Sequence, residues 1–440
     1  MNANLKVASN AMDKIVALCK RRGFIYPGSE IYGGLNGMWD LGPLGTLLAN
    51  NIKNEWWKSI VFSRDDVVGL DSSILYHAKV WKASGHIASF TDPLIECKIC
   101  HERFRVDHKK DISEHENMHD KPKWTEIKPF NLMFKTYVGP IDDEENKTYL
   151  RPETAQGIFI NFQNVVNSTR VKIPFGIAQI GKGFRNEITT GNFLFRVREF
   201  EMMELEYFVK PGTDDKWYEY WRDERINWYI NLGIKKNNIK LVDIPKKDIA
   251  HYARKATEVW YNWPFMGFGE LEGIVNRSDY DLVQHSKFSG KDLSYQDEEL
   301  NEKYTPYVIE PSVGVGRALL AFLLDSYYED EKRVVLKLHP KLAPIKVAVF
   351  PLLANKLPLV NLSKDIYYNL KEQISGMVAF DDRGNIGKRY YFQDEIGTPF
   401  CITVDFQSLE DKTVTVRDRD SMKQERVKAD KIFDYLVRKL

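Results

Sequence analysis

The middle of the chain alternates between apolar and polar residues in a way that predicts two antiparallel strands. An apolar, β-prone run begins at Val171, and a second β-prone run ends at Phe208. The turn-prone residues 190–192 lie between the runs, which predicts that a flexible loop joins the two strands. Because side chains alternate between the two faces of a strand, four residues of the second run share one face: Arg198, Phe200, Met202 and Glu204.

Helical periodicity predicts most of the elements around this pair. Residues 5–22 form an amphipathic pattern, and residues 45–62 and 213–238 also predict helices. A further helix is predicted for residues 251–260, and a strand for residues 267–274. The acidic residues of that glycine-framed strand, Glu270 above all, are candidates for holding a divalent cation, although a strand with a solvated edge explains them as well.

A strand-to-helix junction precedes the apolar helix predicted for residues 318–327. Its sequence, Glu310-Pro-Ser-Val-Gly-Val-Gly-Arg317, contains glycines that permit a ligand to approach the backbone closely. A helix N-terminus favours anions, whereas Arg317 in the first turn opposes the helix macrodipole. This local cost suggests that Arg317 binds a charged ligand.

Two changes of pattern divide the chain. Residues 97–128 are strongly polar, with clustered Lys, Glu, Asp and His, which predicts an inserted subdomain within residues 91–148. From Pro344 onwards, strands alternate with helices, which predicts a small α/β domain. The expected division is therefore a domain of residues 1–340 that contains the insertion, followed by a domain of residues 341–440.

Composition narrows the class of protein without identifying it. With 440 residues, 43% hydrophobic and 28% charged, the chain is expected to be globular and to form two or three domains. No apolar run approaches the roughly 18 residues that span a bilayer, and the N-terminus has no signal-peptide pattern, so we expect a cytoplasmic protein without membrane contact. The net charge of +1 shows no overall basicity, but it leaves room for a nucleic-acid partner bound by local Lys and Arg.

Two of the four cysteines belong to a pattern with metal-ligand spacing. Cys97-x2-Cys100-x14-His115-x3-His119 matches a Cys2His2 structural zinc site, and zinc would supply folding energy to a segment with few apolar residues. The alternative is two free cysteines on a surface knuckle beside solvated histidines. His115-Glu-Asn-Met-His119 also matches the zinc-protease signature H-E-x-x-H, but its flanks predict no buried helix and no third ligand.

The face of the second central strand combines groups with complementary binding chemistry. A guanidinium, an aromatic ring and a carboxylate on one sheet surface suit a phosphate, a purine and an amine; a plain surface hairpin with Arg and Glu is the competing interpretation. The chain has no G-x-x-x-x-G-K-[ST] motif and no G-x-G-x-x-G after a strand. P-loop and Rossmann nucleotide binding therefore lose support.

These segments together resemble the class II aminoacyl-tRNA synthetases, and the glycyl branch most of all. Arg185-Asn-Glu187 followed by Phe195-Arg-Val-Arg-Glu-Phe-Glu-Met-Met-Glu204 resembles motif 2, and the junction ending at Arg317 resembles motif 3. Arg-Pro-Glu153-Thr-Ala-Gln-Gly is also a specific string of the glycyl branch. The glycine-rich segment before residue 45, with the predicted helix of residues 45–62 and the β-prone run through Leu70, resembles its motif 1. The class I signatures H-I-G-H and K-M-S-K-S are missing.

The resemblance implies an α+β fold: an antiparallel-sheet catalytic domain with an inserted subdomain, and a C-terminal α/β anticodon-binding domain. It further implies a homodimer formed through motif 1. The implied activity is that of a glycine–tRNA ligase, which activates glycine with ATP and Mg²⁺ and transfers it to the 3′ end of tRNA-Gly, with no DNA partner. Two alternatives stay open: a sister synthetase for proline, threonine, serine or histidine, and a synthetase-like protein that binds tRNA without charging it. The Arg151–Gly157 and Glu310–Arg317 strings argue against the first, and the presence of Arg185 and Arg317 argues against the second.

The resemblance also implies roles for individual residues. Arg185 is expected to hold the α-phosphate, Glu187 the adenine amino group and Arg317 the γ-phosphate, and these three are the expected catalytic residues. The expected ATP site comprises Arg185, Asn186, Glu187, Phe195, Arg196, Val197, Arg198, Glu199, Phe200, Glu270, Leu271, Gly314, Val315, Gly316 and Arg317, with Glu270 near Mg²⁺. The expected glycine site comprises Arg105, Glu153, Phe200, Glu201, Met202, Met203, Glu204, Glu310, Pro311, Ser312, Val313 and Gly314.

Overall fold

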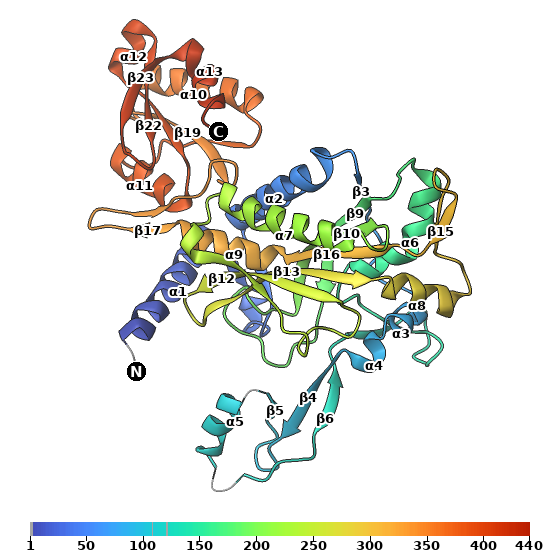
Figure 1. Cartoon of the computed structure of the whole chain (residues 1–440). Coiled ribbons are helices and arrows are strands. Elements are labelled where there is room, and N and C mark those ends of the chain that lie inside the picture. Colours follow the sequence, from blue (N-terminus) through green and yellow to red (C-terminus); the bar gives the residue numbers. More distant parts are fainter. Residues whose placement is uncertain (1–2, 108, 120–121) are drawn as a thin grey trace.

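A seven-stranded sheet forms the centre of the larger part of the chain (Figure 1). The computed structural model describes residues 3–107, 109–119 and 122–440. Neighbouring strands of the sheet are antiparallel, apart from the parallel pair β3 and β9. In spatial order the strands are β11 (Ile239–Asp243), β12 (Lys255–Trp263), β13 (Gly267–Ser278), β16 (Tyr307–Gly314), β10 (Glu199–Val209), β9 (Phe175–Phe184) and β3 (Val67–Gly69).

Helices cover both faces of this sheet. The largest apolar core lies on one face and includes alternate residues of β10, such as Met203, Leu205 and Tyr207. The helices that contribute to it are α1 (Ala3–Arg22), α2 (Pro43–Trp57), α7 (Asp214–Asn231) and α9 (Val315–Ser326). A second core, around Phe208, packs α6 (Ala155–Ser168) and α8 (Tyr280–Ser289) against the other face. That second core covers one end of its face, and the rest of the face is available for a site.

The helix predicted for residues 251–260 is wrong, because strand β12 occupies this stretch from Lys255. Thr257, Val259, Tyr261 and Trp263 are buried, and the residues between them are not. This period of two belongs to a strand, and the aromatic and β-branched residues favour it. The helices predicted for residues 5–22 and 45–62 are present, with α2 continuing as a π-helical turn at Lys58–Phe62. The helix predicted for residues 213–238 ends early, at Asn231, and only a short 3-10 helix follows at Lys236–Asn238.

The polar insertion forms a small lobe that projects away from the sheet (Figure 1). Its three strands are β4 (Thr91–Glu96), β5 (Arg103–Arg105) and β6 (Lys128–Asn131), in the order β5-β4-β6. Helix α5 (Lys109–Glu116) lies beside them, and the hairpin of β7 (Lys135–Tyr137) and β8 (Lys147–Tyr149) leads back to the main body. The short helices α3 (Ala78–Ala83) and α4 (His86–Ser89) precede the lobe. The remaining short pairs are β1 (Ile25–Pro27) with β2 (Trp39–Leu41) and β14 (Tyr295–Asp297) with β15 (Glu302–Tyr304).

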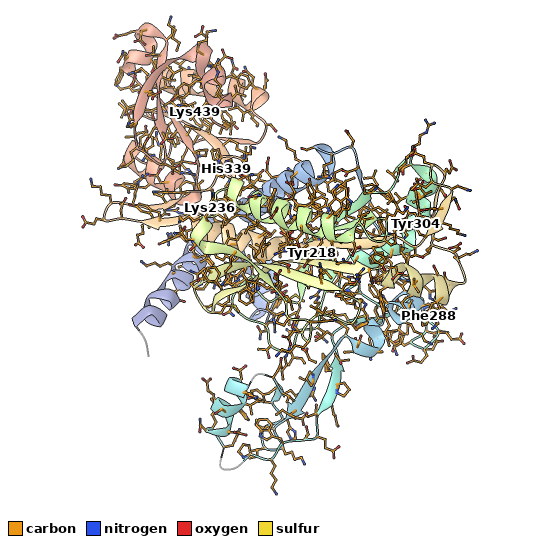
Figure 2. The ribbon with its side chains drawn as sticks, viewed as in Figure 1. Tyr218, Lys236, Phe288, Tyr304, His339 and Lys439 are labelled. Atoms are coloured by element: carbon orange, nitrogen blue, oxygen red, sulfur yellow. The ribbon has the colours of Figure 1, made fainter. Side chains whose placement is uncertain are left out.

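The C-terminal part forms a separate five-stranded mixed sheet. It is connected to the main body by the hairpin of β17 (Tyr327–Glu329) and β18 (Val334–Leu336) and by the segment around His339, which lies at the junction in Figure 2. In spatial order its strands are β20 (Met377–Phe380), β19 (Ile345–Pro351), β21 (Phe400–Val404), β22 (Thr413–Asp418) and β23 (Gln424–Lys428). Its helices are α10 (Leu357–Gln373), α11 (Ile386–Ile396), α12 (Phe406–Asp411) and α13 (Ile432–Val437). Across the described residues of both parts, no helix has the length and apolar character needed to cross a membrane.

Candidate active site

A cavity of about 340 Å³ opens on the sheet face opposite the main core. Arg185, at the end of β9, and Arg317, in the first turn of α9, both line it. Strand β10 supplies the floor through every second residue, because alternate side chains share a face: Phe200, Met202 and Glu204 line the cavity. Gly183 lies opposite Phe200 on β9, and a Cβ atom there would come within 2.8 Å of the ring. This glycine lets the ring lie flat over the neighbouring strand.

Most of the predicted site residues lie around this single cavity. Of those predicted for ATP, the cavity wall includes Arg185, Glu187, Phe195, Arg196, Val197, Phe200, Glu270, Leu271, Gly314, Gly316 and Arg317. Of those predicted for glycine, it also includes Glu153, Met202, Glu204, Glu310 and Ser312. Residues that are far apart in the sequence therefore meet because β9, β10, β13 and β16 are neighbours in the sheet.

The remaining predicted residues do not line the cavity. Glu201 lies on the other face of β10, where its carboxylate is 3.0 Å from Lys53 Nζ, and Met203, Pro311, Val313 and Val315 are also buried away from the cavity. Glu199 pairs at the surface with Lys182. These residues are sequence neighbours of lining residues. Their side chains do not line the cavity, because the alternation of the strands or the start of helix α9 directs them away from it.

Three more predicted residues, Asn186, Arg198 and Arg105, do not line the cavity and have other contacts. The backbone N–H of Asn186 donates to the carbonyl of Leu132, and the Arg198 guanidinium donates to the carbonyls of Glu187 and Asn36. Arg105 donates to Asp107 and Asp92. Hydrogen bonding to Asp107 and the charges of Asp92 and Glu187 raise the pKa of Arg105 against the effect of burial.

Arg317 and Glu270 define one end of the cavity. Arg317 Nη1 lies 2.8 Å from Glu270 Oε2, and Arg317 Nε donates to the carbonyl of Phe195 over 3.1 Å. The Arg317 guanidinium also lies 4.5 Å from the centre of the Phe195 ring. Although desolvation raises the pKa of Glu270, the guanidiniums of Arg317, Arg185 and Arg196 lower it below the ordinary value. This end therefore carries a surplus of positive charge.

Carboxylates dominate the opposite end. Glu204 is buried and accepts hydrogen bonds from the backbone N–H groups of Thr154 and Ala155, the Thr154 hydroxyl and the Ser312 hydroxyl. These donors fix its position and satisfy its charge. The carboxylate of Glu153 lies 3.3 Å from the ring of His86. The start of α6, which begins at Ala155, and the residues just before it thus supply Glu153 and three of the four donors that hold Glu204.

One buried arginine organises the rest of the acidic end. The Arg277 guanidinium donates two hydrogen bonds to Asp281 and a third, of 2.9 Å, to Glu310 Oε2. Burial raises the pKa of Glu310 to about 7, with Glu204 and Glu153 adding to the shift and Arg277 opposing it. A carboxyl group with this pKa changes its charge near neutral pH, and a cation bound beside it favours the ionised form.

Five residues of the cavity wall were not predicted from the sequence: Leu194, Tyr252, Gly273, Val275 and Arg277. Three of them could have been predicted from the sequence. Leu271 was predicted, and continuing its period of two along β13 gives Gly273, Val275 and Arg277. Tyr252 lies in the segment before β12, where the sequence predicted a helix and gave no indication of an approach to the site.

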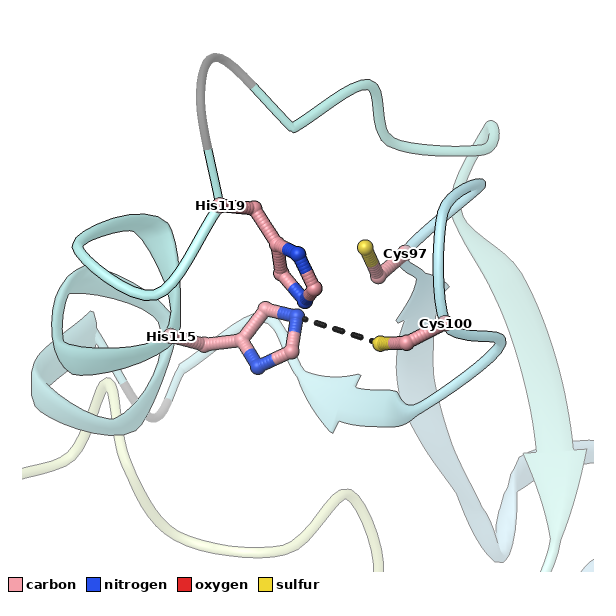
Figure 3. A group of neighbouring side chains, drawn as sticks. All are labelled: Cys97, Cys100, His115 and His119. Carbon is pink, nitrogen blue, oxygen red and sulfur yellow. Dashed lines mark hydrogen bonds between the residues drawn. The ribbon is translucent and has the colours of Figure 1, made fainter.

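The four predicted metal ligands come together in the insertion (Figure 3). The ligand atoms of Cys97, Cys100, His115 and His119 all lie within 4.8 Å of one another, and Cys100 Sγ is 3.4 Å from His115 Nε2. A tetrahedral zinc with bonds of about 2.0–2.3 Å places its ligands roughly 3.3–3.8 Å apart, so the set fits zinc after small adjustments. His115 Nδ1 lies 3.2 Å from the Glu102 carboxylate, the type of partner that orients a metal-binding histidine.

The same geometry argues against the zinc-protease interpretation. Helix α5 ends at Glu116, so His115 lies on it and His119 lies beyond it. H-E-x-x-H chemistry needs both histidines on one helix face and an open coordination position. Here the two histidines face two cysteines, a donor set typical of closed structural sites.

Comparison with known proteins identifies the family. The family model described as "tRNA synthetase class II core domain (G, H, P, S and T)" matches residues 134–327, and that described as "Anticodon binding domain" matches residues 346–439. The glycine–tRNA ligase of Thermobifida fusca is 53% identical, covering 98% of this chain and 98% of its own length. Those of Cutibacterium acnes and Streptomyces coelicolor are each 52% identical, covering 98% and 99% of this chain and 97% and 99% of their own. The expected α+β architecture with an anticodon-binding domain is confirmed, and the chain belongs to the glycine–tRNA ligase family of class II tRNA synthetases.

Proposed function

We propose that this protein activates glycine with ATP and transfers it to the 3′ end of tRNA-Gly. The observation that carries the proposal is the polarity of the cavity, which has arginines at one end and hydrogen-bonded carboxylates at the other. Such a cavity suits a ligand with a phosphate chain at one end and an ammonium group at the other. The full-length similarity to glycine–tRNA ligases supports the same activity.

In the first step a carboxylate oxygen of glycine attacks the α-phosphorus of ATP. The bond between that phosphorus and the oxygen of pyrophosphate breaks, and pyrophosphate leaves with the electron pair. We assign Arg185 to the α-phosphate and Arg317 to the γ-phosphate, Phe200 to the purine face and Glu187 to the adenine amino group. Phosphoryl transfer of this kind depends on positioning and charge neutralisation, which two guanidiniums in one cavity can provide.

Magnesium accompanies ATP in this proposal and neutralises part of the phosphate charge when bound. Carboxylate oxygen is the ligand that Mg²⁺ prefers, and the Glu270 side chain, 46% exposed beside Arg317, suits that role. In the second step, the terminal ribose hydroxyl of the tRNA attacks the glycyl carbonyl carbon and passes its proton to the phosphate of the departing AMP. The ester bond to tRNA forms as AMP leaves.

We propose that selectivity for glycine comes from a ring of acidic groups around the amino group. Glu153, Glu204 and Glu310 line that end of the cavity together with Ser312. Several carboxylates around one ammonium hold it firmly, and crowding at the α-carbon excludes alanine and larger amino acids.

We propose that the insertion binds one structural zinc ion through Cys97, Cys100, His115 and His119. The convergence of the four donors and the carboxylate partner of His115 support this assignment. Apart from Cys97 and His115 the insertion has few fully buried side chains, and a metal stabilises such segments.

We further propose that the catalytic domain covers residues 1–340, with the insertion at residues 91–148, and that residues 341–440 bind the anticodon. A homodimer formed through the motif 1 region agrees with apolar side chains that are strongly exposed there: Ile31 is 88%, Tyr32 87% and Phe62 77% exposed. A tRNA substrate places the protein in the cytoplasm.

Aminoacylation of purified tRNA tests the proposal. The protein is incubated with ATP, Mg²⁺, tRNA-Gly and radiolabelled glycine, and acid-precipitable label is counted, with labelled alanine and with tRNA-Ala as controls. We expect glycine on tRNA-Gly alone. Absence of glycyl-tRNA with folded protein and intact tRNA would refute the function.

A further inference from the structure

The short segment that leads into the insertion contacts both ends of the active-site cavity. Helix α4 begins at His86, and Phe90 follows its last residue. Residues four apart in a helical turn lie on the same side, and the two rings are 5.4 Å apart. Neither residue lines the cavity itself.

His86 is held between a hydroxyl group and the carboxylate of Glu153. Its Nδ1 lies 2.8 Å from the Ser84 hydroxyl, and its Nε2 lies 3.3 Å from Glu153 Oε2. The ring also packs edge-on against Trp81 at 5.3 Å. The other oxygen of Glu153 accepts a hydrogen bond from the Gln156 amide over 3.1 Å. Both carboxylate oxygens are thereby fixed, and one of them depends on His86.

The groups around Glu153 also affect its ionisation. Burial by itself raises the pKa of Glu153, but His86, Arg277 and the Gln156 hydrogen bond outweigh burial and lower the pKa below its ordinary value. The carboxylate that faces the cavity is thus kept charged, as ammonium binding requires.

Phe90 covers the guanidinium of Arg185. The Arg185 Cζ lies 5.5 Å from the centre of the Phe90 ring and 5.3 Å from that of Phe200, distances at which cation–π attraction acts. Arg185 Nε donates to the carbonyl of Pro152 over 3.1 Å. Two rings and one hydrogen bond therefore restrict the guanidinium, and only Phe90 comes from the insertion side.

The segment is itself firmly anchored. The Asn131 amide donates to the carbonyls of His86 and Ile87, and the backbone N–H of Leu132 donates to the carbonyl of Phe90. The carbonyl of Leu132 in turn accepts from the N–H of Asn186, next to Arg185. The base of the insertion is thus connected by hydrogen bonds to the loop that carries Arg185.

We propose that His86 and Phe90 are positioning residues, one for each substrate: His86 orients Glu153 toward the amino group of glycine, and Phe90 holds Arg185 for the α-phosphate of ATP. The inference rests on the proposed function. It identifies two side chains outside the cavity wall that determine the affinities for glycine and ATP separately.

The test is a set of paired variants in glycine-dependent ATP–pyrophosphate exchange with the full-length protein. His86→Ala removes the contact to Glu153, whereas His86→Gln retains an N–H donor at a similar distance. Phe90→Leu keeps an apolar side chain without an aromatic face, whereas Phe90→Tyr retains the face. Each variant is measured at saturating ATP with varied glycine and at saturating glycine with varied ATP, and its melting temperature is recorded.

We expect the two variants to raise the KM values of different substrates. His86→Ala should raise the KM for glycine by roughly five- to a hundredfold, as for a lost hydrogen bond to a charged group, and change the KM for ATP less than twofold. Phe90→Leu should raise the KM for ATP by roughly three- to thirtyfold, as for a lost cation–π contact, with little effect on glycine. His86→Gln and Phe90→Tyr should recover most of each loss.

Other outcomes overturn the inference. If His86→Ala or Phe90→Leu raises the KM values for glycine and ATP in parallel, the segment has only a structural role. The same holds if either variant changes neither KM value. The same conclusion follows if the conservative variants recover the melting temperature but not the KM. Wild-type protein that shows no glycine-dependent exchange would refute the proposed function, and the inference with it; wild-type exchange without this separation of the KM values refutes the inference alone.

Discussion

At the scale of single residues, the acidic end of the cavity holds more negative groups than its one buried arginine can neutralise. Glu204 and Glu310 line the cavity, and Glu206 lies below them, fully buried, with no hydrogen-bond partner among the described residues. The register that pairs Glu204 with Ser312 and Tyr207 with Ile309 sets Glu206 opposite Glu310. Like charges opposite each other destabilise a sheet, so ionisation of this pair is costly until a cation arrives.

The first prediction concerns the pH dependence of glycine binding. Because the pKa of Glu310 is about 7 and an ammonium prefers its ionised form, protons compete with glycine below that pH. The KM for glycine, measured by pyrophosphate exchange at saturating ATP, should rise by about tenfold for each pH unit below 7. Glu310→Gln should have a high KM without this pH dependence. A wild-type KM that stays constant from pH 6 to pH 8 would contradict the assignment.

The second prediction concerns Glu206. Burial, reinforced by the charges of Glu310, Glu204 and Asp281 and opposed by Arg277, raises its pKa well above the ordinary value. A carboxyl group whose pKa is raised by folding contributes to stability only while it stays protonated. Its contribution is complete below the unfolded-state pKa of about 4.3 and is lost as the pH rises toward the pKa of the folded state. Glu206→Gln should therefore raise the free energy of unfolding by about 1–3 kcal/mol at pH 8 and change it little at pH 4.5. Equal effects in urea titrations at the two pH values would refute this account.

Strand alternation correctly predicted that Phe200, Met202 and Glu204 share the cavity face, whereas the resemblance supplied most of the other site residues. The failures have physical causes. Arg198 was assigned to the strand face, but β10 begins one residue later, and the guanidinium of Arg198 satisfies loop carbonyls instead. Arg277 was missed although the period of two along β13 places it on the cavity face, because its partner Glu310 is distant in the sequence and only the pairing of β13 with β16 brings the two together.

At the scale of elements, the central pair β9 and β10 and the junction before α9 were predictable because their patterns are local. Strand β12 was not, since its aromatic residues suit a buried helix as well as a strand until the sheet order is known. The insertion was recognised by its polarity, whereas its three-stranded sheet was not predicted. Few apolar residues mark these short strands, so the signal for them is weak.

The third prediction concerns the metal in the insertion. The purified protein should contain one zinc ion per chain by elemental analysis. Chelation should make residues 97–128 sensitive to limited proteolysis while the seven-stranded sheet stays folded, because zinc supplies local folding energy.

Two histidine variants of the insertion give a matched comparison. His119→Ala removes a proposed ligand and should lose the zinc, whereas His101→Ala changes an exposed histidine outside the set, with a side chain 76% exposed, and should keep it. Equal zinc content in both variants, or protein without zinc that resists proteolysis, would refute the site.

At the scale of the whole molecule, a buried ionic cluster connects the two sheets. Asp394 of α11 accepts hydrogen bonds of 2.7–2.9 Å from Arg333, in the hairpin after α9, and from Arg417 of β22. All three side chains are at most 8% exposed. Arg317 lies in the first turn of α9 and Arg333 lies in the hairpin that follows this helix, so the cluster connects the C-terminal part to the hairpin after the helix that carries a cavity arginine.

The fourth prediction follows from that cluster. Asp394→Asn leaves two buried guanidiniums without their carboxylate and should lower the free energy of unfolding by about 3–5 kcal/mol. It should also reduce charging of tRNA-Gly more than glycine-dependent pyrophosphate exchange, because only charging requires the anticodon contacts proposed for the C-terminal part. Asp420→Asn, at a side chain 52% exposed beside Arg419, is the matched control and should change stability by less than about 1 kcal/mol. Similar losses in both variants would contradict the role of the cluster.

The central claim is that one cavity clamps ATP between Arg185 and Arg317 and admits only the smallest amino acid. The most direct test is ATP–pyrophosphate exchange measured with each of the twenty amino acids, in the wild type and in Arg185→Ala. We predict exchange with glycine alone, and its loss in a variant that melts at the wild-type temperature. Exchange driven by a different amino acid, or undiminished glycine-dependent exchange in Arg185→Ala, would contradict the claim.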